Sequence, residues 1–197
     1  MSSRVIFIGS PVSSGKNYRK LFSVSVWDLY FRIFASFMPP FGAKYRRVYV
    51  DLIGPLLAWI SLTVLLTYGN LFKNNTLSPV KVMIIYGGFM PVFCYGLAKL
   101  GKSGISFLEN LSLVGYSLYG HLYTLLISFV LFRESSNSFF FLSMIVFGGL
   151  SSLRLILVFL KTIPVPGVRL LVCSSIALVN ILFLIYLHFS FMHRNVS

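Results

Sequence analysis

Acidic side chains carry proton relays and acid–base catalysis, and this chain of 197 residues has only four of them. They are Asp28, Asp51, Glu109 and Glu134. All four lie at or outside the ends of long apolar runs, so no two carboxylates are expected together at membrane depth. Proton relays and cation pathways through membranes are built from such ionisable groups. The acidic residues therefore argue against an enzyme and against proton-coupled transport.

Histidine and cysteine, the usual ligands of transition metals, are equally sparse. His121 falls inside an apolar run, and His188 and His193 are five residues apart, a spacing that does not align two ligands on one helix face as four does. Cys94 and Cys173 also lie inside apolar runs, which is typical of buried packing. We therefore expect no catalytic residue, no metal site and no cofactor.

Arg154 is the one strongly charged residue within an apolar run, about six residues before the end of the fourth run. Two interpretations stay open for it. The side chain can extend toward the membrane surface or bond a neighbouring carbonyl, or it can bind a lipid phosphate or a carboxylate of a partner. His121 lies at similar depth in the third run, and we expect it to be a packing residue with its polar atoms satisfied. Arg154 and His121 are the two candidate polar contacts.

The elements that must position these residues are five long apolar runs. They cover residues 52–72, 80–100, 111–132, 139–160 and 170–192. Each holds about 20 residues, enough at about 1.5 Å per residue to cross a hydrocarbon core ~30 Å thick. Lipid offers no partner to backbone N–H and C=O groups, so such spans must be helices. The sequence predicts an all-α, polytopic transmembrane bundle with five spans.

The basic residues indicate how this bundle is oriented. The net charge is +13, and eight of the 17 basic residues precede the first run, so the positive-inside rule places the N-terminus in the cytosol. With five spans the C-terminus is then luminal. Lys44, Arg46 and Arg47 are expected to attract anionic lipid of the bilayer. Topology explains the basic excess, and we expect no nucleic-acid partner. The links after spans two and four add to the cytosolic charge through Lys99, Lys102, Lys161 and Arg169.

A shorter apolar segment, residues 24–38, precedes the first span and is ended by Pro39-Pro40. Its length, its aromatic residues Trp27 and Tyr30, and its single charges Asp28 and Arg32 favour a short amphipathic helix in the membrane interface. Packing against the bundle is the alternative. Asp28 and Arg32 are four residues apart and would meet on one helix face.

These features divide the chain into four parts. We expect a flexible cytosolic N-terminus (1–23), an interfacial helix with a basic juxtamembrane segment (24–50), a five-span membrane domain (51–193) and a short luminal tail (194–197).

Small residues concentrate in the third and fourth spans, where they let helix backbones approach closely. The candidates are Gly115, Gly120, Gly148, Gly149 and Ser152. Gly148 and Ser152 are four residues apart, the spacing of close-packing membrane helices. Both packing within the chain and packing against another subunit stay open.

Two acceptor sequences for N-glycosylation fall on the predicted luminal side, at Asn74 and Asn195. Both lie close to the bilayer, where clearance is small. A third, at Asn110, lies on the cytosolic side and is not expected to be used.

Two short patterns resemble the Yip domain family of five-span membrane proteins, named for interaction with Ypt/Rab GTPases. The first span begins Asp51-Leu52-Ile53-Gly54-Pro55, which matches the family pattern Asp/Glu-Leu-Tyr-Gly-Pro except at Ile53. The third span contains Gly115-Tyr116-Ser117, which matches Gly-Tyr-Ser/Gly. The family motif residues here are therefore Asp51, Leu52, Gly54, Pro55, Gly115 and Tyr116. The resemblance is closest to member three of the YIPF branch.

This resemblance implies a non-enzymatic membrane protein of the Golgi, at the cis-Golgi or between endoplasmic reticulum and Golgi. It implies a role in vesicle trafficking and Golgi structure, as a scaffold or adaptor in a hetero-oligomer with another Yip-domain protein. Rab GTPases are a further implied partner. A second class of function, a small membrane transporter or a lipid-handling protein, stays as the alternative.

Overall fold

The computed structural model describes residues 25–37, 50–73, 77–131 and 138–192, and every regular element in these ranges is a helix. The elements are α2 (Val26–Phe37), α3 (Ile53–Lys73), α4 (Pro79–Leu100), α5 (Phe107–Leu131), α6 (Ser138–Ser143), η2 (Met144–Gly148), α7 (Gly149–Thr162), α8 (Pro166–Leu187) and η3 (His188–Met192). Five helical stretches are long and apolar enough to cross a membrane, which confirms the predicted fold class.

The spanning helices begin up to four residues from the predicted starts of the apolar runs, because capping residues and proline determine where a helix begins. α5 starts at Phe107 because Ser106 and Glu109 form a capping box, in which Ser106 N donates to Glu109 Oε2 (2.8 Å) and Glu109 N donates to Ser106 Oγ (3.3 Å). α8 starts at Pro166, whose missing N–H costs nothing in the first turn of a helix.

The fourth and fifth spans each contain a π-helical turn. Residues 138–162 form one span through α6, η2 and α7, and residues 166–192 form another through α8 and η3. A π turn widens the helix by one residue and redirects the side chains around it. Beside η2, the Thr124 hydroxyl of α5 lies 3.4 Å from Ser143 O and 2.7 Å from Gly120 O, so α5 contacts the span at the point where its winding changes.

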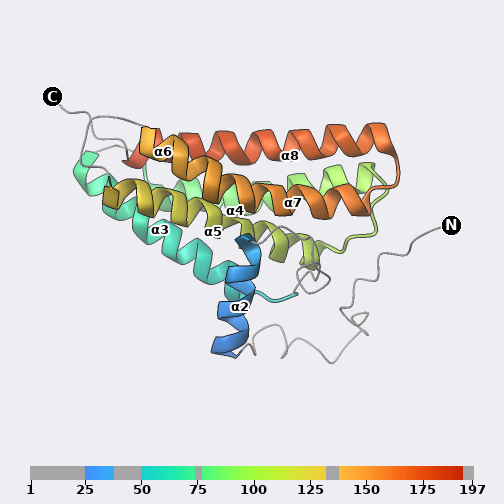
Figure 1. Cartoon of the computed structure of the whole chain (residues 1–197), viewed down its shortest axis with the longest axis horizontal. Helices are drawn as coiled ribbons and strands as arrows, with labels where there is room; N and C mark the ends of the chain where they lie inside the picture. The colour runs from blue at the N-terminus through green and yellow to red at the C-terminus, as the bar shows by residue number, and fades with distance from the viewer. Residues whose placement is uncertain (1–24, 38–49, 74–76, 132–137, 193–197) are drawn as a thin grey trace.

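α5 is the central helix of the bundle. In its apolar window 67% of the residues lie inside the protein, against 28–39% in the other four spans. It contacts α2, α3, α4, α6, η2 and α7, and its contact with α3 is the most extensive in the bundle. The long helices run along the length of the molecule, whereas α2 is set across it (Figure 1). Side chains that touch α5 therefore join several spans at once.

The helix before the first span packs against the bundle through its C-terminal half. Ala35 and Ser36 are buried, and α2 contacts α3, α5 and α7. Its N-terminal half is open, since Trp27 is 81% and Tyr30 is 67% exposed. The helix is thus attached to the bundle, and the membrane interface stays the predicted location of its open half.

Some predicted features lie outside the described residues. They are the flexible segment 1–23, the basic residues Lys44, Arg46 and Arg47, the sequon residues Asn74 and Asn195, and the tail 194–197.

Candidate functional site

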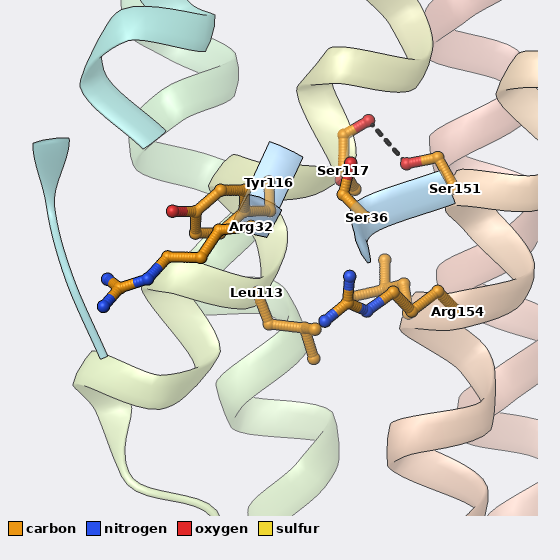
Figure 2. Close-up of a pocket in the computed structure, with 8 residues that line it drawn as sticks. Arg32, Ser36, Leu113, Tyr116, Ser117, Ser151 and Arg154 are labelled. Carbon is orange, nitrogen blue, oxygen red and sulfur yellow. Dashed lines mark hydrogen bonds between the residues drawn. The ribbon is translucent and has the colours of Figure 1, made fainter. Parts of the chain in front are cut away.

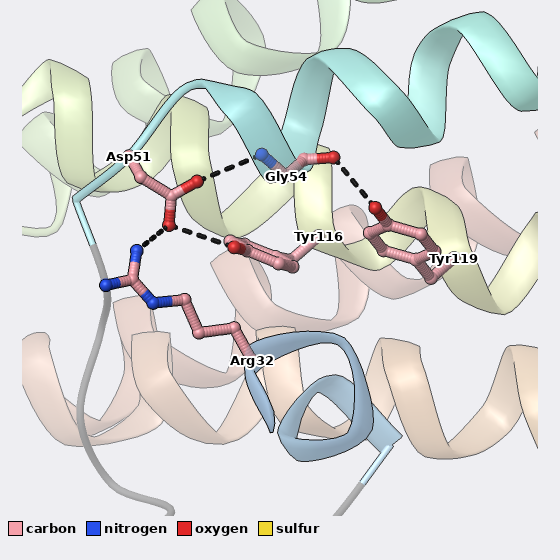
Figure 3. Close-up of polar contacts among 5 residues, drawn as sticks. All are labelled: Arg32, Asp51, Gly54, Tyr116 and Tyr119. Atoms are coloured by element: carbon pink, nitrogen blue, oxygen red, sulfur yellow. Dashed lines mark hydrogen bonds and ion pairs between the residues drawn. The ribbon is translucent and has the colours of Figure 1, made fainter. Parts of the chain in front are cut away.

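A buried carboxylate, Asp51, joins α2, α3 and α5 directly ahead of the first span (Figure 3). Its side chain is fully buried and forms an ion pair with Arg32 of α2, in which Arg32 donates to Asp51 Oδ2 at 2.5 Å. Tyr116 Oη of α5 donates to the same oxygen at 2.9 Å, and Gly54 N donates to Oδ1 at 3.1 Å. The last of these bonds caps the N-terminus of α3, where a negative charge is favourable.

We call Arg32, Asp51, Gly54, Tyr116 and Tyr119 the polar joint. Tyr119 completes it by donating its hydroxyl to the Gly54 carbonyl at 3.0 Å. The sequence suggested a pair between Asp28 and Arg32 within one helix. The ion pair that the structure shows instead connects Arg32 to the following helix, while Asp28 is exposed.

Glycine is needed at two positions beside the polar joint. A Cβ atom on Gly54 would lie 2.3 Å from Tyr116 Oη, and one on Gly115 would lie 2.3 Å from Pro55 Cβ. Both distances are far below van der Waals contact. The two family motifs, about 60 residues apart in sequence, therefore contact each other, and each glycine makes room for a residue of the other motif.

A small cavity lies between α2, α5 and α7, beside the polar joint (Figure 2). It encloses about 10 Å³, which is room for about one water molecule. Its wall includes Arg32 and Ser36 of α2, Ser117 of α5, and Ser151 and Arg154 of α7. Ser151 Oγ donates to Ser117 O at 2.9 Å, which ties α7 to α5.

Arg154 is 7% exposed and lies eight residues before the end of α7, about 12 Å at 1.5 Å per residue. The sequence predicted a depth of six residues from the end of the span. The observed depth is larger because α7 continues beyond the apolar run to Thr162. Figure 2 shows its guanidinium group directed toward the cavity wall at Leu113. Arg154 therefore lies among the elements that surround the polar joint.

A second polar network links four spans at the centre of the bundle. Asn180 of α8 accepts a hydrogen bond from Tyr86 Oη at 2.9 Å and donates to Ser152 Oγ at 2.6 Å. His121 Nε2 lies 3.2 Å from the Asn180 carbonyl, and the ring of Tyr86 stacks on Phe183 at 3.6 Å. The His121 Nδ1 atom is buried without a hydrogen-bond partner among the described residues, so its polar atoms are only partly satisfied.

The predicted small residues lie at contacts within the chain. A Cβ atom on Gly120 would be 2.4 Å from Ser151 Cβ, and one on Gly148 would be 2.8 Å from Leu184 Cδ2. Ser152 is buried in the Asn180 network. Gly149 makes no such close contact with another helix. The nearest atom to a Cβ placed on it would be Met144 O of the same span, at 3.8 Å.

Sequence reasoning missed four residues of these sites: Arg32 as the partner of Asp51, Tyr119, and the pair Tyr86 and Asn180. A single Asn within an otherwise apolar span is a signal that could have pointed to Asn180, since buried polar groups in lipid are usually hydrogen-bonded between helices. No group of three or more His, Cys, Asp or Glu residues suited to a metal ion occurs in the described ranges.

These features define a membrane protein built as a five-span helical bundle, with a sixth, shorter helix attached by a buried ion pair. Residues 27–192 match the family described as YIPF3 C-terminal domain, and the chain belongs to this family within the Yip proteins. The match begins in α2 and ends in η3, so it includes the polar joint and all five spans. No solved structure matches the chain.

Proposed function

We propose that this chain is a non-enzymatic scaffold or adaptor of the Golgi and endoplasmic reticulum. In this role it takes part in vesicle trafficking and in maintaining Golgi structure, in a hetero-oligomer with another Yip-domain protein and in contact with Rab GTPases. The observation that carries the proposal is the family match over residues 27–192. The trafficking role, the partners and the compartment are what membership of that family leads us to expect.

The geometry supports an adaptor because it fixes a short helix on the outside of the bundle. Arg32 and the buried residues Ala35 and Ser36 hold one end of α2, while Trp27 and Tyr30 face outward. Exposed aromatic residues are typical of interfaces, both with proteins and with the membrane surface. With the predicted orientation, this surface lies on the cytosolic side, where Rab proteins act.

The test is recovery of partners by the full-length chain purified in mild detergent, with mass spectrometry of the bound proteins and microscopy of its location. We expect a second Yip-domain protein in the eluate and co-localisation with Golgi markers. Trp27→Ala/Tyr30→Ala should reduce partner recovery several-fold, because it removes the open aromatic surface of α2. Leu178→Ala/Leu182→Ala is the matched control and should leave partner recovery unchanged. Both leucines are exposed, but they lie on α8 and not on α2.

A purified chain that brings no Yip-domain protein, and that resides outside the Golgi and endoplasmic reticulum, would contradict the proposal. Equal recovery by both double variants would show that the partner binds elsewhere than on α2.

The alternative, a small transporter or a lipid-handling protein, has one observation in its favour. An apolar groove opens between α3 and α4, and it suits lipid rather than an aqueous solute.

A further inference from the structure

The groove between α3 and α4 has α5 as its floor. Pro55 and Trp59 of α3 form one wall, Ile84 and Pro91 of α4 form the other, and Leu118 belongs to the floor. It encloses about 480 Å³, a volume within the range of roughly 300–1,000 Å³ typical of small-molecule sites. The groove is therefore large enough to hold a ligand rather than a few water molecules.

One end of the groove is closed by a tryptophan. Trp59 Nε1 donates to the Met83 carbonyl at 3.0 Å, and the indole approaches α4 closely because Gly87 has no side chain; a Cβ there would lie 3.1 Å from Trp59 Nε1. Beyond this bridge Leu62 and Met83 are fully buried, so the two helices pack together. The groove thus ends part of the way along α3.

The groove is shorter than one leaflet of the bilayer. Leu52 and Trp59, the first and last α3-side residues of its wall, are seven residues apart, about 10 Å at 1.5 Å per residue. Half of a ~30 Å hydrocarbon core is about 15 Å. A transmembrane helix of a partner would cross both leaflets, whereas an acyl chain occupies one.

The lining offers no free polar side chain to an occupant. Tyr86 and Trp59 are the only lining residues with a polar side-chain atom, and both are already donors, to Asn180 and to the Met83 carbonyl. The remaining lining residues are aliphatic, proline or glycine. The occupant must therefore be apolar over its whole buried length.

A positive charge lies beyond the open end. Ile84, Pro91, Tyr95 and Lys99 follow one face of α4 at helical spacing, so Lys99 stands two turns, about 12 Å, past Pro91. Its Nζ lies 5.2 Å from the centre of the Tyr95 ring, and Lys99 is exposed. An ammonium group at this level favours the phosphate of an anionic lipid.

We propose that the groove is a lipid site: it holds one acyl chain of a membrane phospholipid, with the chain end at Trp59 and the phosphate at Lys99. The site is independent of the trafficking role, since any partner protein would bind in addition to the lipid.

Tryptophan fluorescence can test this site directly. The chain has two tryptophans, so Trp27→Phe leaves Trp59 as the only one. The full-length variant, stripped of lipid in detergent, is titrated with a phosphatidylserine brominated near the end of its acyl chain, because bromine quenches an indole that it touches. We expect quenching that saturates at one lipid per chain.

A matched pair of variants separates the groove from the general lipid-facing surface. Leu56→Phe/Ile84→Phe narrows the groove from both walls and should abolish the saturable quenching. Leu57→Phe/Ile85→Phe makes the same change at the neighbouring exposed positions outside the groove and should leave it intact. Lys99→Gln should weaken binding of phosphatidylserine about fivefold, the effect of one charge near the membrane surface.

Quenching that rises without saturation, or that responds equally to both double variants, would overturn the lipid site. Unchanged affinity in Lys99→Gln would overturn the assignment of the phosphate. Loss of Yip-domain partner recovery in Leu56→Phe/Ile84→Phe, with quenching retained, would show that a partner helix occupies the groove and would also overturn the proposal.

Discussion

Asp51 is the residue on which most of the polar joint depends. A carboxylate withdrawn from water is costly unless it is paired and hydrogen-bonded. Here it receives hydrogen bonds from Arg32, Tyr116 and the Gly54 amide, from three different helices or helix ends. Removing the charge would leave Arg32, whose side chain is only 19% exposed, beside a neutral group. The Arg32–Asp51 ion pair is therefore largely buried, and it holds α2 against the bundle.

Asp51→Asn tests this role with the smallest change of shape. Asparagine can still cap α3 through Oδ1, but its amide nitrogen replaces the oxygen that accepts from Arg32 and Tyr116. The variant therefore removes the charge together with these two hydrogen bonds, and breaking a buried pair costs about 3 kcal/mol. For a chain of this size that is a fall in Tm of roughly 6–12 °C. Thermal unfolding in detergent, followed by circular dichroism, gives the value.

Asp28→Asn is the control, because it makes the same change at an exposed position of α2 and should alter stability by less than ~0.5 kcal/mol. Similar falls in Tm for the two variants would show that Arg32 does not depend on Asp51.

The sequence identified several important residues of the site, but it did not predict which of them contact each other. Asp51, Gly54, Pro55, Gly115 and Tyr116 stood out because of the family patterns. Nothing in the sequence showed that the two patterns meet, because contacts between residues about 60 positions apart depend on how the helices pack. For the same reason Arg32 suggested a local pair with Asp28, four residues away, and its pairing with Asp51 came only from the structure.

At the scale of elements, hydropathy predicted all five spans because lipid demands a continuous apolar helix. It could not place the helix starts, which depend on the Ser106–Glu109 capping box and on Pro166. It also missed the π turns η2 and η3, since one extra residue in a turn leaves the hydropathy of a span unchanged. These turns redirect side chains, so they matter for sites even though they do not alter the span count.

The contact of α3 with α5 can be tested through its glycines. Gly54→Ala and Gly115→Ala each insert a methyl group into occupied space, and overpacking of this kind costs about 1–3 kcal/mol. Gly88→Ala and Gly96→Ala are matched controls on α4, where the added methyl has no atom within 4 Å beyond the neighbouring backbone of its own helix. The controls should stabilise the helix by about 0.5–1 kcal/mol relative to glycine.

Thermal unfolding of the four single variants in one detergent makes the comparison. If all four variants shift Tm in the same direction, Gly54 and Gly115 are not required for the close contact between α3 and α5.

At the scale of the whole molecule, most of the described basic residues lie at one end of the bundle, whereas Lys73 and Lys81 lie at the other end and Arg154 lies within α7. α4 ends near Lys99 and Lys102, α7 ends near Lys161 and α8 begins near Arg169. Because neighbouring spans alternate in direction, this is also the end at which α3 begins and α2 is attached. The positive-inside rule therefore predicts that the polar joint, α2 and Lys99 lie together on the cytosolic side.

The proposed adaptor role requires this orientation, because Rab GTPases and the membrane surface that α2 would contact are cytosolic. Single cysteines at the two ends of α4 report on it most directly. Lys102→Cys lies in the link between α4 and α5, and Leu77→Cys lies just before α4; both native residues are exposed. The native Cys94 and Cys173 are buried, so the unchanged chain gives the background.

Labelling with a membrane-impermeant maleimide in sealed, cytosolic-side-out microsomes is the deciding measurement. We predict that Lys102→Cys is labelled at once, and that Leu77→Cys is labelled only after detergent opens the vesicles. Labelling of Leu77→Cys in intact vesicles, with Lys102→Cys protected, would place α2 and the polar joint in the lumen and contradict the account.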